Sequence, residues 1–151
     1  MAKPIRVLIV DDVRETRAAL ARLIALEADM TVVGFACNGV EAIQGAARAE
    51  PDVVLMDICM PVLDGIVATE WLTRLPGWTA PVIVMSAQAD GGHRERARLA
   101  GAVAYLEKPF SAVDFIELIR IVHARGRKEI PPFPYEPLDA RATARTAAVL
   151  N

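Results

Sequence analysis

Three aspartates that follow apolar segments are the residues of this sequence best suited to chemistry. Asp11 and Asp12 follow the run Ile5–Val10, and Asp57 follows the run Val53–Met56. If the two runs are neighbouring strands, their ends gather three carboxylates, which are stable together only when protons or a cation offset the charge. Carboxylate oxygens are hard ligands that favour Mg2+ or Mn2+. The pattern therefore predicts a metal-assisted phosphate site.

The elements that would position these aspartates alternate along the chain. Apolar segments are followed by segments with apolar residues at helical spacing. Such alternation predicts an α/β fold, a parallel sheet covered by helices on both faces, with every strand's carboxyl end at one edge. The expected strands are Ile5–Val10, Thr31–Ala36, Val53–Asp57, Pro81–Met85 and Val103–Leu106. The expected helices are Arg14–Leu26, Val40–Ala47, Gly65–Leu75, a helix that follows Gly91–Gly92 to about Ala100, and a last helix from its cap Ser111 to Arg125.

Size and composition fit one globular unit and disfavour several other classes of protein. The chain has 151 residues, of which 54% are hydrophobic, enough for a single core. A net charge of −2 gives no electrostatic argument for binding nucleic acid or an anionic membrane. Since no apolar run reaches the roughly 20 residues that span a bilayer and the start is not signal-like, we expect a cytoplasmic protein. Cys37 and Cys59 lack a CxxC spacing, which favours two reduced thiols.

Four groups of residues carry a family resemblance, because they occur together in the right order and spacing. They are Asp11–Asp12; Met56–Asp57 with Met60–Pro61 and Asp64–Gly65; Ser86–Ala87; and Tyr105 with Lys108, Pro109 and Phe110. Over about residues 4–125 the chain resembles the response-regulator receiver domain, the CheY-like phosphoacceptor module of two-component signalling. The resemblance implies a flavodoxin-like, doubly wound sheet of five parallel strands in the order 2-1-3-4-5.

The resemblance implies a role for each residue of the acidic cluster. Asp57 would accept a phosphoryl group from the phosphohistidine of a histidine kinase or phosphotransfer protein, and Lys108 would offset charge on that group. Mg2+, or alternatively Mn2+, would be held by Asp11, Asp12, Asp57 and the backbone carbonyl of Cys59. The protein would be a signalling phosphoacceptor rather than an enzyme, although it would assist its own phosphorylation and dephosphorylation. Its output would be altered binding of a downstream protein target.

The family pattern also implies a conformational switch and residues that set the lifetime of the acyl phosphate. The Ser86 hydroxyl would donate a hydrogen bond to the phosphoryl group, and Tyr105 would turn inward when that hydroxyl moves. Cys59 and Gln88 lie two residues beyond Asp57 and Ser86. Side chains at those two positions influence how water reaches the acyl phosphate.

In this family the surface of the fourth helix, fifth strand and fifth helix commonly carries phosphorylation-dependent dimerisation or target binding. Here the fourth helix has a basic face over residues 93–98, which is either solvated or a dock for an acidic partner. On the fifth helix, Ile121 is expected among Asp114 and Glu117, away from the core-facing stripe. An exposed isoleucine at that position suggests a homodimer.

Each site residue also has an ordinary structural interpretation. Asp11 and Asp12 could cap the next helix, Lys108 could lie in a solvated turn, Ser86 could be a loop hydroxyl, and Tyr105 could be core packing. The alternatives for the chain are a flavodoxin-like enzyme or cofactor-binding protein, including an aspartate-nucleophile phosphatase, and a phosphate-independent receiver-like adaptor. Two acids after the first strand would repel a bare phosphate, which disfavours a flavodoxin-type loop.

Residues 126–151 differ in composition from the rest of the chain. Four prolines between positions 131 and 137 preclude a regular helix or a central strand there. Ala140–Leu150 is alanine-rich and could form a short helix, but its length makes that helix marginal. We therefore expect a receiver domain over residues 1–125 and a proline-rich tail over residues 126–151. The tail either ends in the short helix or is disordered.

Overall fold

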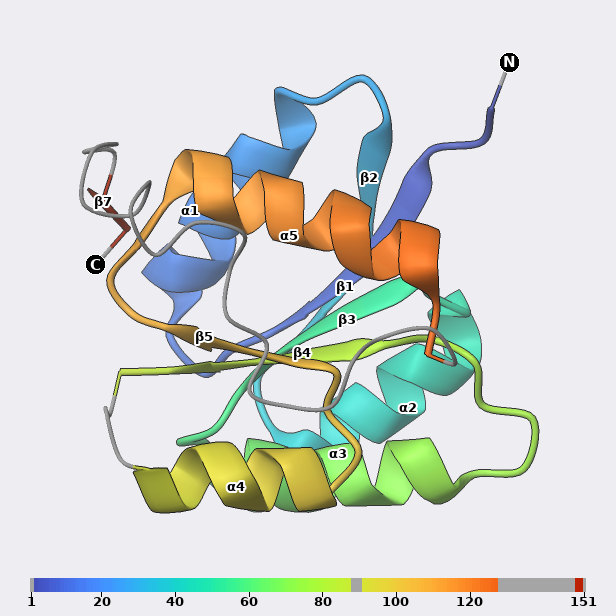
Figure 1. Ribbon diagram of the computed structural model, residues 1–151, viewed down its shortest axis with the longest axis vertical. Helices are drawn as coiled ribbons and strands as arrows, with labels where there is room; N and C mark the ends of the chain where they lie inside the picture. Colours follow the sequence, from blue (N-terminus) through green and yellow to red (C-terminus); the bar gives the residue numbers. More distant parts are fainter. Residues whose placement is uncertain (1, 88–90, 128–148, 151) are drawn as a thin grey trace.

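The five predicted strands and five predicted helices alternate in the expected order in the computed structural model, which describes residues 2–87, 91–127 and 149–150 and adds two short strands (Figure 1). The strands are β1 (Ile5–Val10), β2 (Met30–Ala36), β3 (Val53–Asp57), β4 (Val82–Ser86), β5 (Ala104–Glu107), β6 (Phe110–Ser111) and β7 (Val149–Leu150). The helices are α1 (Arg14–Ala25), α2 (Gly39–Ala49), α3 (Gly65–Arg74), α4 (Gly91–Leu99) and α5 (Ala112–Arg125).

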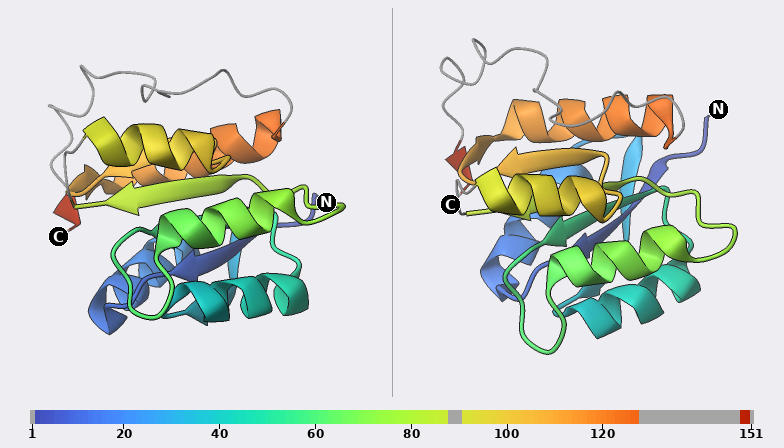
Figure 2. Two further views of the ribbon diagram at one scale, coloured as in Figure 1. Left: turned by 90° about the horizontal axis from the view of Figure 1, so that it is seen from below. Right: turned by 60° about the horizontal axis from the view of Figure 1, so that its bottom comes forward.

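The main sheet has five parallel strands in the order β2-β1-β3-β4-β5, which confirms the predicted flavodoxin-like topology. Helices α1 and α5 cover one face, and α2, α3 and α4 cover the other (Figures 1 and 2). The strand order reverses between β1 and β3. Ligands of open α/β sheets bind at the carboxyl edge beside such a reversal, so the residues that follow β1 and β3 are the best placed to bind one.

Alternate residues of each strand belong to two separate hydrophobic cores. Val7 and Ile9 pack with residues of α1 and α5, whereas Leu8 and Val10 pack with residues of α2 and α3. Because helices cover both faces, the strands are apolar at nearly every position, as expected for a buried parallel sheet. Among the residues that the structure describes, no helix has the length and apolar character needed to cross a bilayer.

Side-chain caps fix where three of the helices begin. The predicted cap of α5 is confirmed, since the Ser111 hydroxyl accepts a hydrogen bond from the Asp114 N–H at 3.0 Å. Asn38 caps α2 in the same way, and Asp64 caps α3 through the Val67 N–H at 2.9 Å. Each cap satisfies a backbone donor that the first helical turn leaves unpaired.

The start of α4 differs from the sequence prediction. Gly91 and Gly92 were expected to free the chain before a helix, but they are the first two residues of α4. Glycine weakens a helix mainly in its interior, and the first N–H groups of any helix have no intrahelical acceptor. The first turn therefore tolerates both glycines.

The prediction that Ile121 projects from α5 as an exposed residue is wrong. Ile121 is half-buried and packs against the core shared by α1 and α5, and Leu118 is buried as well. The apolar stripe of α5 is wider than helical spacing alone suggested, because α1 lies alongside this flank and partly shields it. Ile121 therefore gives no support to a homodimer. The homodimer itself stays a prediction.

The structure describes the tail beyond Arg127 only at Val149–Leu150, which pair antiparallel with Phe110–Ser111 as strands β7 and β6. The short helix expected over Ala140–Leu150 is thus wrong at its last two residues. Strand pairing to a neighbouring segment satisfies backbone groups that a marginal helix would have to satisfy alone. The remainder of that helix and the proline-rich segment lie outside the described residues.

Candidate functional site

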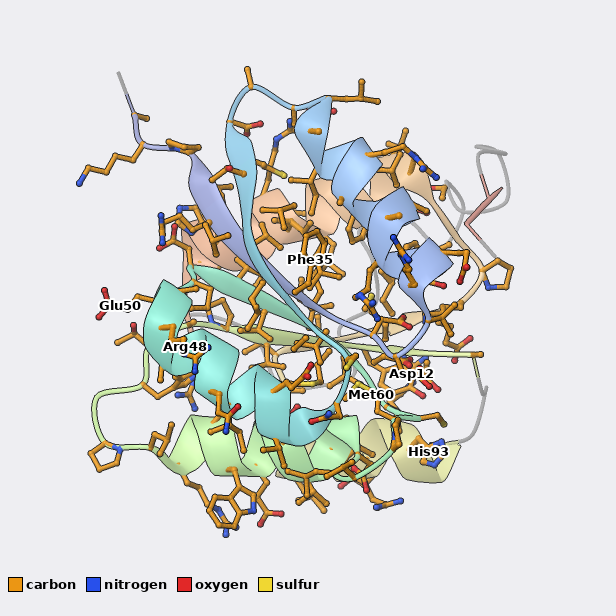
Figure 3. All side chains as sticks on the ribbon, turned by 180° about the vertical axis from the view of Figure 1, so that it is seen from behind. Asp12, Phe35, Arg48, Glu50, Met60 and His93 are labelled. Carbon is orange, nitrogen blue, oxygen red and sulfur yellow. The ribbon has the colours of Figure 1, made fainter. Side chains whose placement is uncertain are left out.

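Polar residues from four strands meet at one edge of the sheet. They are Asp11 and Asp12 after β1, Asp57 at the end of β3, Ser86 at the end of β4, and Lys108 after β5. Parallel strands produce this convergence because all of their carboxyl ends share one edge. Figure 3 shows Asp12 near Met60 at this edge, while Glu50 lies at the opposite end of the molecule.

The three aspartates predicted to hold a metal lie close enough to share one ion. Asp11, Asp12 and Asp57 each offer a carboxylate oxygen, and the three oxygens lie within 4.8 Å of one another. Asp11 is fully buried and Asp57 is 7% exposed, whereas Asp12 is open to solvent. Two shielded carboxylates and one exposed carboxylate form a hard, anionic cluster with a solvent-facing side, which suits a divalent cation that keeps some of its water.

Helix capping does not explain the paired acids after β1. The N-cap of α1 is Val13, and no side chain caps this helix. Asp11 uses one carboxylate oxygen to accept a hydrogen bond from the Val13 N–H at 2.8 Å, and its other oxygen accepts from the Lys108 ammonium, also at 2.8 Å. Asp11 therefore stabilises the turn after β1 and also points a charged oxygen toward the other strands.

Lys108 connects two of the aspartates. Its ammonium lies 2.8 Å from Asp11 and 3.3 Å from Asp57, and its side chain is only 16% exposed. Burial opposes the charge of this ammonium, but the hydrogen bond to Asp11 and the nearby charge of Asp57 outweigh burial and raise the pKa of Lys108. The group is therefore cationic near neutral pH, and Lys108 does not lie in an ordinary solvated turn.

The Asp57 carboxyl group has a strongly shifted pKa. Burial raises it most, the ammonium of Lys108 opposes that effect, and the negative charges of Asp11 and Asp12 raise it further. The net result raises the pKa of Asp57 from 3.8 to about 6. A carboxylate that lacks sufficient compensating charge in its native surroundings is a candidate for binding a cation or an electrophile.

The loop between β3 and α3 holds Asp57 through close backbone contacts. The Gly65 N–H donates to the Ile58 carbonyl at 2.9 Å, and a Cβ atom at Gly65 would lie only 1.8 Å from the Asp57 carbonyl oxygen. Val62 has a φ of 69°, an uncommon conformation for a β-branched residue, and is exposed. Cys59 is also exposed on this loop, so solvent reaches the side chain two residues beyond Asp57.

The two predicted switch residues lie on adjacent strands. Ser86 is the buried last residue of β4, and its carbonyl accepts a hydrogen bond from the Lys108 N–H at 2.7 Å. Tyr105 lies on β5 with its side chain buried at 3% exposure, so its ring occupies the inward position. Gln88 lies outside the described residues, and its predicted effect on lifetime stays a prediction.

Sequence reasoning missed Arg17. The Arg17 guanidinium on α1 donates a hydrogen bond to the Asp11 backbone carbonyl at 2.6 Å. This contact ties the first helix to the loop that carries the acids and brings positive charge close to them. No motif indicated the contact, because a backbone carbonyl carries no sequence signal; an arginine in the helix directly after two acids was the only available hint.

Comparison with known proteins identifies the family. The family model described as the response regulator receiver domain matches residues 7–120. The chain belongs to the response regulator receiver domain family. Receiver domains bind Mg2+ at an acidic cluster of this kind and interact with histidine kinases or phosphotransfer proteins. This receiver domain therefore has a phosphorylation-dependent signalling role, and the predicted family is confirmed.

Similar proteins include curated sequences and solved structures. The receiver is 43% identical over 128 residues to the uncharacterized transcriptional regulatory protein YvfU of Bacillus subtilis, covering 85% of this chain and 63% of YvfU. The response regulator domain of Thermotoga maritima CheB has a TM-score of 0.74 and 35% identity, with 81% of this chain and 98% of that chain covered. A chain of the CheX–CheY–BeF3–Mg2+ complex from Borrelia burgdorferi has a TM-score of 0.72 and 27% identity, with 81% and 90% covered. The chain thus spans less than two thirds of YvfU.

Proposed function

We propose that Asp57 is the phosphoacceptor of this receiver and that its phosphorylation controls binding to a protein partner. A carboxylate oxygen of Asp57 forms the bond to phosphorus while the bond from phosphorus to a histidine nitrogen of the donor breaks. The donor is a histidine kinase or a phosphotransfer protein. The observation that carries the proposal is the contact of one partly buried ammonium, that of Lys108, with both Asp57 and Asp11 in a cluster of three carboxylates.

The residues around Asp57 suit a reaction in which positioning and charge compensation matter more than nucleophile strength. Lys108 places a fixed positive charge beside the oxygen that attacks. Asp11, Asp12, Asp57 and the Cys59 carbonyl would hold Mg2+, or Mn2+ in its place, and the spacing of the three carboxylates supports this assignment. When bound, the ion offsets negative charge on the transferring oxygens.

The signal would leave the site through Ser86 and Tyr105. The Ser86 hydroxyl would move toward the phosphoryl group on Asp57 and donate a hydrogen bond to one of its oxygens. The inward position of the Tyr105 ring would accompany this movement of the hydroxyl. The surface formed by α4, β5 and α5 lies beyond these two residues. We propose it as the surface for a downstream protein or for a second copy of the chain.

The proposal is tested by incubating the protein with Mg2+ and acetyl phosphate and reading intact mass. The parent protein is expected to gain the mass of one phosphoryl group, and Asp57→Ala is expected to gain none. Asp29→Ala is the matched control, since Asp29 is an exposed carboxylate paired with Arg120, and it should label like the parent. An unlabelled parent, or equal labelling of Asp57→Ala, would contradict the proposal.

Cys59→Asn is expected to shorten the lifetime of the acyl phosphate several-fold without preventing its formation. Cys59 is exposed two residues beyond Asp57, and an amide, unlike a thiol, both donates and accepts strong hydrogen bonds that can orient an attacking water. The measurement is the rate of phosphate loss after removal of acetyl phosphate. Cys37→Ser is the control, because its hydroxyl can replace the thiol that donates to Glu41. Equal decay of Cys59→Asn and parent would refute a tuning role.

A further inference from the structure

Arg94 on α4 makes two contacts with β5 that neither the family resemblance nor the proposed phosphotransfer requires. Its guanidinium carbon lies 5.0 Å from the centroid of the Tyr105 ring, and its Nη2 atom lies 2.8 Å from a carboxylate oxygen of Glu107. The side chain of Arg94 is 31% exposed and that of Glu107 is 46% exposed. The arginine therefore covers a buried aromatic ring and is itself held by a surface carboxylate.

The strand geometry explains how one arginine reaches both residues. Side chains two apart on a strand point to the same face, so Tyr105 and Glu107 both face α4, whereas Leu106 belongs to the core on the opposite face. Helix α4 lies beside β5 in the right-hand view of Figure 2. The two contacts are thus made by one planar guanidinium group across a single helix–strand interface.

These contacts lead directly to the phosphorylation site. Glu107 is followed by Lys108, whose ammonium contacts Asp57 and whose backbone N–H binds the Ser86 carbonyl. Moving α4 away from β5 would therefore release the Tyr105 ring and the Glu107 side chain together, and Glu107 directly precedes Lys108. Among the described residues no other arginine of α4 makes this pair of contacts, and Arg98 pairs with Glu95 within the helix.

We propose that Arg94 is a positioning residue of the phosphorylation switch: by stacking on Tyr105 and pairing with Glu107, it holds the switch in the inward arrangement before any phosphoryl group is bound. This inference rests on the proposed phosphoacceptor function of Asp57. A ligand binds more weakly when only a fraction of the protein is in the competent conformation. By holding Tyr105 inward, Arg94 raises the fraction of the receiver that is ready to bind phosphate and so strengthens that binding.

The test uses Mg2+ with beryllofluoride, a mimic of the phosphoryl group, and fluorotyrosine NMR. The chain has two tyrosines, so Tyr135→Phe leaves the Tyr105 signal alone in the spectrum. Arg94→Ala is expected to weaken beryllofluoride binding about fivefold, in line with the typical strength of a partly exposed cation–π contact and ion pair. It is also expected to move the Tyr105 signal of the free protein toward that of a solvent-exposed ring.

Graded variants separate positioning from general loss of structure. Arg94→Lys keeps the charge and should recover much of the affinity, while Glu107→Gln removes the ion pair and leaves the stacking, which predicts an intermediate value. Arg98→Ala is the matched control, an arginine of the same helix whose partner is Glu95, and it should bind beryllofluoride like the parent. Thermal unfolding of each variant shows whether the fold is retained.

Two results would overturn the inference. One is unchanged beryllofluoride affinity and an unchanged Tyr105 signal in Arg94→Ala; the other is an equal loss in Arg94→Ala and Arg98→Ala. Failure of the proposed function is recognised separately, because the parent would then take up no phosphoryl group on Asp57 from acetyl phosphate. The Tyr105 signal of the free protein does not depend on that reaction.

Discussion

In the absence of divalent ions, Asp57→Asn is expected to raise the free energy of unfolding at pH 7 by about 2 kcal/mol. The pKa of Asp57 is raised from 3.8 to about 6, mainly by burial, and each pKa unit corresponds to about 1.4 kcal/mol. The shift in the pKa of Asp57 thus corresponds to about 3 kcal/mol of lost stability. Relaxation of the site around the charge reduces this loss to about 2 kcal/mol. Asparagine has nearly the same shape and removes the charge, so the variant avoids this destabilisation.

The pH dependence has a definite sign. Because the folded protein holds the Asp57 proton more tightly than the unfolded chain does, the parent loses stability as the pH rises from about 4 to about 6. The advantage of Asp57→Asn should therefore be small near pH 4, grow across that range and level off by pH 7. Urea unfolding of both proteins at each pH, in the presence of a chelator, measures this difference in the free energy of unfolding.

Addition of Mg2+ provides the control for this result. An ion that binds only the folded protein stabilises it by mass action, so Mg2+ should stabilise the parent more than Asp57→Asn and narrow the difference between them. A stability difference that is the same at pH 4 and pH 7 would show that the Asp57 charge does not destabilise the metal-free fold. A difference that Mg2+ leaves unchanged would show that Asp57 does not contribute to binding the ion.

The sequence predicted the sheet and the edge at which the site lies because both depend on long-range pattern. The run Val53–Met56 is apolar at every position, as a strand buried on both faces must be, and Asp57 ends it. Once the strands are parallel, the topology alone brings Asp57 to Asp11 and Lys108, which are 46 and 51 residues away. The convergence of these residues therefore needed no side-chain detail.

What the sequence did not predict depends on contacts that leave no pattern. Arg17 binds a backbone carbonyl, and Arg94 binds an aromatic ring on another element. Neither partner lies at a characteristic distance along the sequence from its arginine, so no spacing predicts the contact. The partial burial of Ile121 depends on how closely α1 approaches α5, which helical periodicity does not specify. Packing geometry decides such details, and it follows from the whole fold rather than from a local run of residues.

Gly65→Ala is expected to lower the free energy of unfolding by about 3 kcal/mol and to slow phosphorylation. A Cβ atom at this position would lie 1.8 Å from the Asp57 carbonyl oxygen and 2.8 Å from its carbon. Backbone atoms cannot rotate away as a flexible side chain can, so the start of α3 must move from the end of β3. Overpacking a rigid buried site typically costs about 1–3 kcal/mol, and this contact is at the severe end.

Gly45→Ala is the matched control for this substitution. Gly45 lies inside α2, where a new Cβ atom would meet its nearest neighbour, a Leu8 methyl group, at an ordinary 3.6 Å. Alanine favours a helix interior by up to about 1 kcal/mol, so Gly45→Ala should be neutral or stabilising in the same urea titration. If both variants unfold like the parent, the close approach of α3 to the Asp57 carbonyl does not constrain the loop. If Gly65→Ala alone loses both stability and phosphoryl uptake, the position of Asp57 depends on a residue without a side chain.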